Sequence, residues 1–163
     1  MNAEDQAAFD LLMADAIVPC GTCHACCHSP VEVRPDWGDD PADYRLAVSV
    51  DKTAPNQHAM VTLDRKDDGS CYALRNGRCS IWEKRPRVCR TFDCRKMFVM
   101  HSKAERRELV DKGYFRKAVL QAGRNRVATL EGGDVIQSAA RRLNFGRRSI
   151  DFMEKRRGVE VKA

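Results

Sequence analysis

The chain has 163 residues, of which 43% are hydrophobic and 32% charged, and eight of them are cysteine. That length favours one domain with a modest apolar core. The first residues are acidic where a secretory signal would be basic, and no apolar run is as long as a membrane span. We therefore expect a cytoplasmic protein with no membrane contact.

The first predicted element is an amphipathic helix over residues 3–17. Phe9, Leu12, Met13 and Ala16 follow the i, i+3, i+4, i+7 spacing of one helix face, and Pro19 marks the stop. We expect this face to pack in the core.

A cysteine cluster follows at once, with four thiols among eight residues: Cys20, Cys23, Cys26 and Cys27. Two consecutive C-x-x-C steps let three sulfurs converge, and converging soft ligands suit zinc or an iron–sulfur cluster. A disulfide knot is the less favoured alternative, because cytoplasmic thiols stay reduced. His24 and His28 are candidates to replace a thiol.

The adjacent pair Cys26-Cys27 suggests two metal centres that lie close together. On an extended chain neighbouring side chains point to opposite sides, so each thiol would serve a different metal.

Residues 29–58 contain four prolines and are predicted to be rich in loops. Asp40-Pro41 has the form of an N-cap followed by proline, which predicts a short helix near 41–48. Trp37 and Tyr44 are expected to pack over the cysteine-rich segment.

A strand is predicted around Val61 and Leu63, and a hairpin is predicted around Asn76-Gly77. Pairing across that turn would place Leu74 opposite Cys79 and Cys71 opposite Trp82. Cys71 and Cys79 would then lie roughly 10 Å apart on opposite faces. Either they serve separate centres, or the pairing is shorter than the pattern suggests.

The next segment carries the last two cysteines, with Pro86 suited to a first helical turn. Cys89 and Cys94 would be separated by about 140° on a continuous helix, so the helix breaks between them or they point in different directions. Nearby cations are expected to lower the thiol pKa values: Lys84, Arg85, Arg87, Arg90, Arg95 and Lys96. Arg85 and Arg90 are kept as candidate substrate-side residues.

Residues 95–163 read as helices. Ser102 and Glu105 match a capping box, a further apolar segment spans 119–127, and another spans 135–143 with Asp134 as its predicted N-cap. His101 lies outside any cluster and is expected at the surface.

The cysteine pattern resembles a known family. C-x-x-C-x-x-C-C at 20–27 continues as Cys71-x7-Cys79-Ser-Ile-Trp-Glu and then Arg85-Pro86-x-x-Cys89-Arg90. It is similar to the bacterial CxxCxxCC (YkgJ-like) cysteine-cluster proteins, described as zinc- or iron-chelating. A similar segment in flagellin lysine methylases, which are associated with an iron–sulfur cluster, favours that cofactor, as a [4Fe–4S] form, over zinc. The candidate metal ligands are Cys20, Cys23, Cys26, Cys27, Cys71, Cys79, Cys89 and Cys94.

Charge divides the chain. Residues 1–94 contain 11 Lys and Arg against 15 Asp and Glu, whereas residues 95–163 contain 18 against 8. A basic half can bind nucleic acid, but it can also offset the negative charge of coordinated thiolates. We favour charge compensation; no groove-reading motif accompanies the arginine clusters.

These observations predict a mostly helical α+β fold in one domain, 1–163: a cysteine-rich metal lobe with a small β-hairpin (1–94) and a basic helical region (95–163). The favoured function is metal binding through an iron–sulfur cluster, zinc or two centres, in metal handling or redox. A metal-dependent protein- or peptide-modifying enzyme and a zinc-stabilised nucleic-acid-binding module are the alternatives. Catalytic residues are not identified, and a protein partner stays open.

Overall fold

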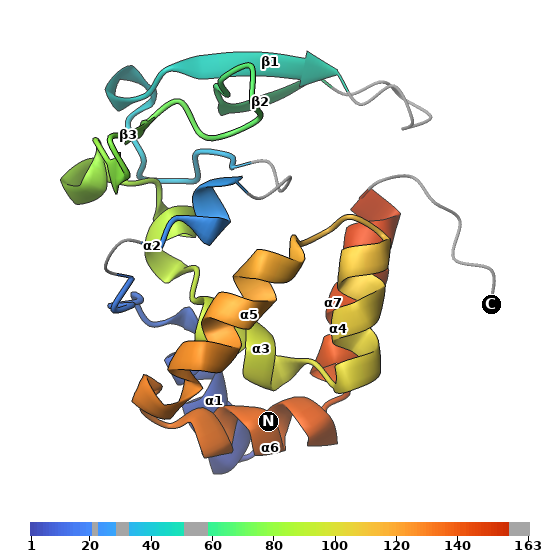
Figure 1. The fold of residues 1–163 in the computed structure, drawn as a ribbon. Helices are drawn as coiled ribbons and strands as arrows, with labels where there is room; N and C mark the ends of the chain where they lie inside the picture. The colour runs from blue at the N-terminus through green and yellow to red at the C-terminus, as the bar shows by residue number, and fades with distance from the viewer. Residues whose placement is uncertain (21–22, 29–32, 51–58, 157–163) are drawn as a thin grey trace.

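The computed structural model describes residues 1–20, 23–28, 33–50 and 59–156 (Figure 1). Its α-helices are α1 (Ala3–Met13), α2 (Arg87–Thr91), α3 (Cys94–Met100), α4 (Lys103–Asp111), α5 (Lys117–Arg126), α6 (Gly133–Arg142) and α7 (Phe145–Arg156). Its strands are β1 (Leu46–Val50), β2 (Ala59–Leu63), β3 (Leu74–Arg75) and β4 (Arg78–Cys79), and its 3₁₀ turns are η1 (Ala25–His28), η2 (Pro41–Asp43), η3 (Trp82–Lys84) and η4 (Val127–Thr129). The fold is α+β and mostly helical, as predicted.

The short helix α3 lies at the centre of the helical part, packed against α5 and α6, while α1 contacts α6 and α4 contacts α7. Figure 1 shows β1 and β2 at one end of the molecule and α1 with α6 at the other. None of the helices in the described ranges is long and apolar enough to span a membrane.

The main apolar cluster joins the helices to the cysteine-rich segment. Its buried members are Leu109, Tyr114, Phe115, Val119 and Ile150. Ala25 from η1, Phe92 and Cys94 pack against this cluster, and the Phe92 and Phe115 rings stack with centroids 6.0 Å apart. The cysteine segment therefore shares its core with the helices that follow it.

Buried polar side chains at the start of α3 bind the end of α1. The Arg95 guanidinium pairs with Asp93 at 2.7 Å and also donates to the Thr129 carbonyl at 3.0 Å. The Lys96 ammonium donates to the carbonyls of Leu12 and Ala14, both at 3.2 Å, which satisfies the free end of α1. Arg95 also donates to the Ile17 carbonyl at 3.4 Å, so these bonds hold the stretch that leads from α1 to Cys20.

The predicted hairpin is confirmed in a short form. Leu74 pairs with Cys79 and Arg75 with Arg78, and Asn76 and Gly77 take the positive φ angles of 47° and 69° that a two-residue turn needs. Cys71 instead bridges Arg65, and Trp82 lies in η3. The predicted pairing of Cys71 with Trp82 is therefore wrong. The two-residue ladder of β3 and β4 does not place Cys71 and Cys79 on opposite faces.

Of the sheet formed by β1 and β2, only the strand β2 was predicted from the sequence. β2 lies where a strand was expected, and it pairs antiparallel with β1 from Leu46↔Leu63 to Val50↔Ala59. The helix expected near 41–48 is only the turn η2, capped by the Asp40 side chain on the Ala42 N–H. The cap was read correctly, but β-branched residues after it favour a strand.

Two expectations about α1 are wrong. The helix ends at Met13, not at residue 17, and Phe9 and Met13 are each 48% exposed. Of the expected face Ala16 is buried, and Ala8 and Asp5 are buried as well. Asp5 pairs with Arg142 from α6. The buried face of α1 is set by its contact with α6.

Three other residues also lie elsewhere than expected. Trp37 is 94% exposed and does not cover the cysteine segment. His101 is 2% exposed: its ring nitrogens lie 2.8 Å from the Met97 carbonyl oxygen and 2.7 Å from Ser149 Oγ. Asp134 lies in the first turn of α6, whose N-cap is Gly132.

Candidate metal centre

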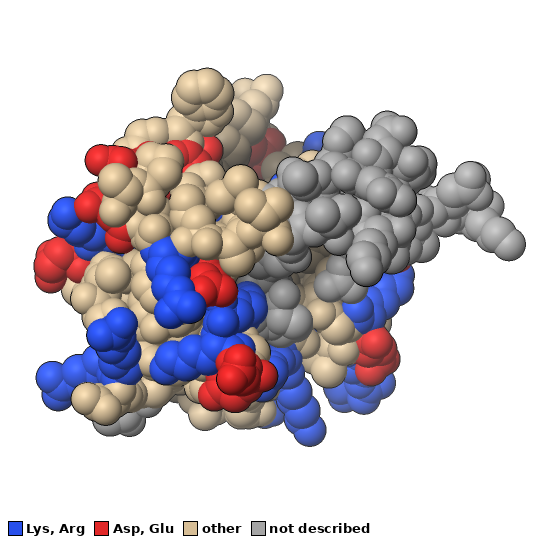
Figure 2. Space-filling model, turned by 90° about the horizontal axis from the view of Figure 1, so that it is seen from above, with Lys and Arg blue, Asp and Glu red and all other residues tan. Residues whose placement is uncertain are grey.

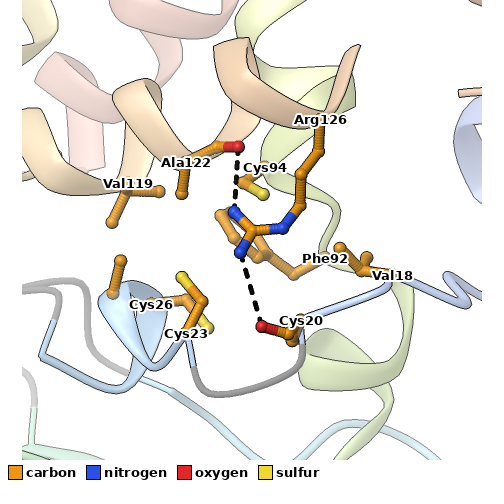
Figure 3. Close-up of a pocket in the computed structure, with 10 residues that line it drawn as sticks. Val18, Cys20, Cys23, Cys26, Phe92, Cys94, Val119, Ala122 and Arg126 are labelled. Atoms are coloured by element: carbon orange, nitrogen blue, oxygen red, sulfur yellow. Dashed lines mark hydrogen bonds between the residues drawn. The ribbon is translucent and has the colours of Figure 1, made fainter. Parts of the chain in front are cut away.

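Four thiols line one small cavity: Cys20, Cys23, Cys26 and Cys94, which we call the first thiol group (Figure 3). The cavity measures about 30 Å³, and the other lining residues are Val18, Ala25, Phe92, Val119, Ala122 and Arg126. Apart from Arg126, those neighbours are apolar. Cys20 and Cys94, which are far apart in the sequence, thus line the same cavity.

Local turns shape the cysteine loop on one side of this cavity. The Cys23 N–H donates to the Cys20 carbonyl at 2.8 Å, and the Cys27 N–H donates to the His24 carbonyl at 2.9 Å. Residues 25–28 form the 3₁₀ turn η1. The chain at Cys26-Cys27 is therefore helical, and the extended conformation expected there is wrong.

Helix α5 provides the other side. The Arg126 guanidinium donates to the carbonyls of Pro19 at 3.1 Å, Cys20 at 3.4 Å and Ala122 at 3.2 Å, and Figure 3 shows it extending from α5 toward Cys20. It ties the cysteine loop to α5.

A close backbone contact sets the position of Cys94. A Cβ on Gly123 would lie 2.0 Å from the Cys94 carbonyl oxygen, so only glycine lets α5 approach α3 this closely. The contact holds the first residue of α3 beside the loop.

The remaining thiols, Cys27, Cys71, Cys79 and Cys89, form what we call the second thiol group. The Cys71 N–H donates to the Cys27 carbonyl at 2.9 Å. Cys79 pairs with Leu74, whose N–H donates to the Cys71 carbonyl at 3.0 Å. Cys89 lies in α2, and a break at Phe92 and Asp93 separates it from Cys94 in α3, as the spacing predicted.

Burial is the main influence on the pKa values of four thiols. It raises the pKa of Cys89 to about 12 and that of Cys94 to about 11, and it also raises the pKa values of Cys20 and Cys79. The expectation that neighbouring cations lower these pKa values is wrong for these four thiols.

Cys26 is the exception. The Cys27 thiol donates a hydrogen bond to Cys26, and this bond, with smaller contributions from backbone N–H groups and Arg85, lowers the pKa of Cys26 to about 7. The same bond, together with burial, raises the pKa of Cys27. Cys26 is also the exposed member of the eight.

Four of the six expected cations contact carboxylates: Lys84, Arg87, Arg90 and Arg95. Lys84 contacts Asp43 at 2.6 Å, and Arg90 contacts Asp39 at 3.7 Å. Arg85 stacks on Trp82, with its guanidinium carbon 3.5 Å from the ring centroid. On the face shown in Figure 2, Lys and Arg side chains lie close to Asp and Glu side chains.

The donor chemistry fits zinc or iron, since all eight cysteines are free thiols and thiolates are soft ligands. Within the described ranges, no three Cys, His, Asp or Glu side chains already surround a common point that could hold an ion. His24 lies against the hairpin turn, with its Nε2 3.2 Å from the position of a Cβ on Gly77.

Two residues that shape this site were missed from the sequence: Arg126, which lines the cavity, and Gly123, which lies against the Cys94 backbone. Arg126 is one arginine among many in the basic half, and Gly123 is one glycine inside a helical segment. Neither carries a local motif, and only the packing of α5 on α3 identifies them.

Clustered free thiols on a helical support define a cysteine-cluster protein. The chain belongs to the CxxCxxCC family, "putative zinc- or iron-chelating domain", whose model matches residues 19–112. That range contains all eight cysteines and ends before α5. No curated protein and no solved structure matches the chain significantly.

Proposed function

We propose that this protein binds zinc or an iron–sulfur cluster through its clustered cysteines and serves in metal handling or redox in the cytoplasm. The observation that supports this most is the first thiol group, in which four free thiols from two distant segments line one cavity.

The donor set restricts the metal. Four sulfurs suit tetrahedral zinc or an iron–sulfur cluster and disfavour magnesium and calcium, which take oxygen ligands. When bound, zinc would cross-link the loop to α3, whereas a cluster would supply one-electron transfer.

The chain's own residues prepare the site. Val18, Phe92 and Val119 line the cavity with apolar surface and restrict water. Arg126 orients the loop through its carbonyls and brings positive charge beside thiols that become negative when they bind metal. Arg126 is therefore the residue of the basic half that we propose offsets the negative charge of the coordinated thiolates.

The test is anaerobic purification of the full chain with elemental analysis and an absorption spectrum. We expect bound zinc, or bound iron with sulfide and visible charge-transfer bands. Cys23→Ser should lower the metal content, while Ala104→Ser, on the exposed face of α4, should leave it unchanged.

A second measurement tests whether the thiols bind metal in the folded protein. Thiol titration of the reduced, metal-replete protein should show few reactive thiols, and a chelator should release them. A folded chain with eight freely titrating thiols and no metal would refute the proposal.

A further inference from the structure

We propose that a second cavity, which lies where α3 and α4 meet α6 and α7, binds a small phosphorylated molecule (Figure 1). This site is separate from the cysteines and does not depend on metal binding. The family model matches residues 19–112, which include α3 and α4 but neither α6 nor α7. The family therefore does not account for this cavity.

The size of the cavity suits a small organic molecule. It measures about 420 Å³, which falls within the roughly 300–1,000 Å³ that is usual for small-molecule sites. Among its lining residues Val99, His101 and Ala140 are buried, whereas Ser102 and Asn144 are exposed. The cavity thus has a buried floor and a rim that solvent reaches.

Cations dominate the charged residues that line the cavity. They are Lys103, Arg106 and Arg141, against the single carboxylate of Glu105. That carboxylate is already engaged, because it accepts a hydrogen bond from the Ser102 N–H at 2.7 Å. The excess of two positive charges matches a phosphate monoester, which carries about −1.5 to −2 charges at neutral pH.

Arg106 is oriented for anion binding. Its Nη1 donates to the carbonyls of Phe98, at 2.9 Å, and of His101, and its guanidinium carbon lies 4.0 Å from the centroid of the Phe98 ring. Within the ranges that the structure describes, its Nε and Nη2 donate to no protein acceptor. These two nitrogens form the edge of the guanidinium that can bond two phosphate oxygens at once.

The neighbouring cations lack compensation by carboxylates. Among the described residues, Lys103 and Arg141 form no ion pair, and both are exposed. Burial, and then the charge of Arg124, lower the pKa of Arg106, so Arg124 lies close enough to repel it. A bound anion would relieve this repulsion, which favours a phosphorylated molecule over a neutral one.

The experiment is isothermal titration calorimetry of the full chain, purified anaerobically, with three probes: ribose 5-phosphate, inorganic phosphate and ribose. We expect saturable binding of both phosphates and no binding of ribose. Failure of the chain to bind either phosphate at millimolar concentration would overturn the proposal, as would binding of ribose as tight as that of ribose 5-phosphate.

Four variants locate the binding site. Arg106→Gln should weaken the binding of ribose 5-phosphate about tenfold, the loss expected for one charged hydrogen-bonding group. Lys103→Gln and Arg141→Gln should each weaken it about threefold, since these side chains are exposed. Arg107→Gln is the matched control, because Arg107 is an exposed cation of α4 that does not line the cavity. It should bind the probe like the natural chain.

The control also separates a defined site from diffuse surface charge. Equal weakening in Arg107→Gln and Arg141→Gln would show a general effect of positive charge and would overturn the proposal. Thermal unfolding shows whether Arg106→Gln is folded. If it is not, Lys103→Gln and Arg141→Gln decide the outcome, because neither side chain contributes a hydrogen bond or ion pair to the described part of the fold.

Discussion

At the residue scale, Arg126 connects the cysteine loop to the rest of the molecule. A single guanidinium bonds two loop carbonyls, at Pro19 and Cys20, and one carbonyl of its own helix. Hydrogen bonds from charged donors contribute more to stability than those from neutral donors. Arg126 therefore holds the loop in place as well as supplying positive charge.

We predict that Arg126→Met destabilises the protein by about 1–3 kcal/mol and speeds zinc release to a chelator. The exposed Arg124→Met, in the same helix, is the control and should change both quantities little. Thermal unfolding and a chelator-release assay measure the two effects. Equal behaviour of the two variants would show that Arg126 plays no positioning role.

A second prediction at this scale concerns pH. Hydrogen bonds from Arg147, and then from Lys112, hold the pKa of Glu108 at about 2, below its ordinary value of 4.5. The depressed pKa means that Glu108 contributes stability above pH 4.5 and loses it as the pH falls toward 2.

Glu108→Gln should therefore reduce the fall in unfolding free energy between these pH values. Denaturant titrations across that range measure it, with the exposed Glu131→Gln as control. An acid-induced loss that is the same in Glu108→Gln as in the natural chain would contradict the assignment.

At the element scale, the contact between α5 and α3 decides the geometry of the first thiol group. Gly123 allows the approach, and Cys94 at the start of α3 is the residue it places. The Asp93 side chain caps α3 and accepts from the Arg95 N–H at 2.8 Å, which sets where the helix begins.

We predict that Gly123→Ala destabilises the protein by about 1–3 kcal/mol, because the new methyl group collides with backbone. Metal bound by the first thiol group should be released faster. Gly133→Ala is the matched control: its Cβ would meet Leu130 at an ordinary 3.5 Å, so the higher helix propensity of alanine should make it neutral or stabilising by up to about 1 kcal/mol. Thermal unfolding distinguishes the two, and a stabilised Gly123→Ala would disprove the close-contact argument.

At the scale of the whole molecule, the cysteine segment and the helices α4–α7 share one apolar cluster, but different interactions stabilise the two parts. The helices bury Leu109, Val119 and Ile150 completely. The segment from Cys20 to Cys89 contains short turns and two small sheets, and its cysteines are only half-buried or exposed.

We predict that metal removal loosens residues 20–94 more than α4–α7. Bound structural zinc supplies roughly 10–16 kcal/mol of apparent free energy in small zinc domains, which loops cannot replace. After chelation or in Cys23→Ser, limited proteolysis should cut within 20–94 while far-UV circular dichroism retains most helical signal. An undisturbed cysteine segment would refute this prediction, as would loss of all helicity at once.

Local patterns in the sequence were sufficient for several features. The Asn76-Gly77 turn, the register of Leu74 with Cys79 and the Ser102–Glu105 capping box depend on neighbours within a few residues, and the structure confirms them. The cysteine spacing also identified the family, because that pattern is carried by the residues themselves.

The tertiary structure alone decided what lies between distant segments. Which cysteines share a cavity depends on α3 meeting the loop, and that contact depends on Gly123 and Arg126 in α5. His101 is buried because α7 places Ser149 beside it. The pKa values of Cys89 and Cys94 rise because packing removes water, whereas charge counted along the sequence predicted the opposite. Burial and long-range contact are properties of packed elements, so no spacing along the chain encodes them.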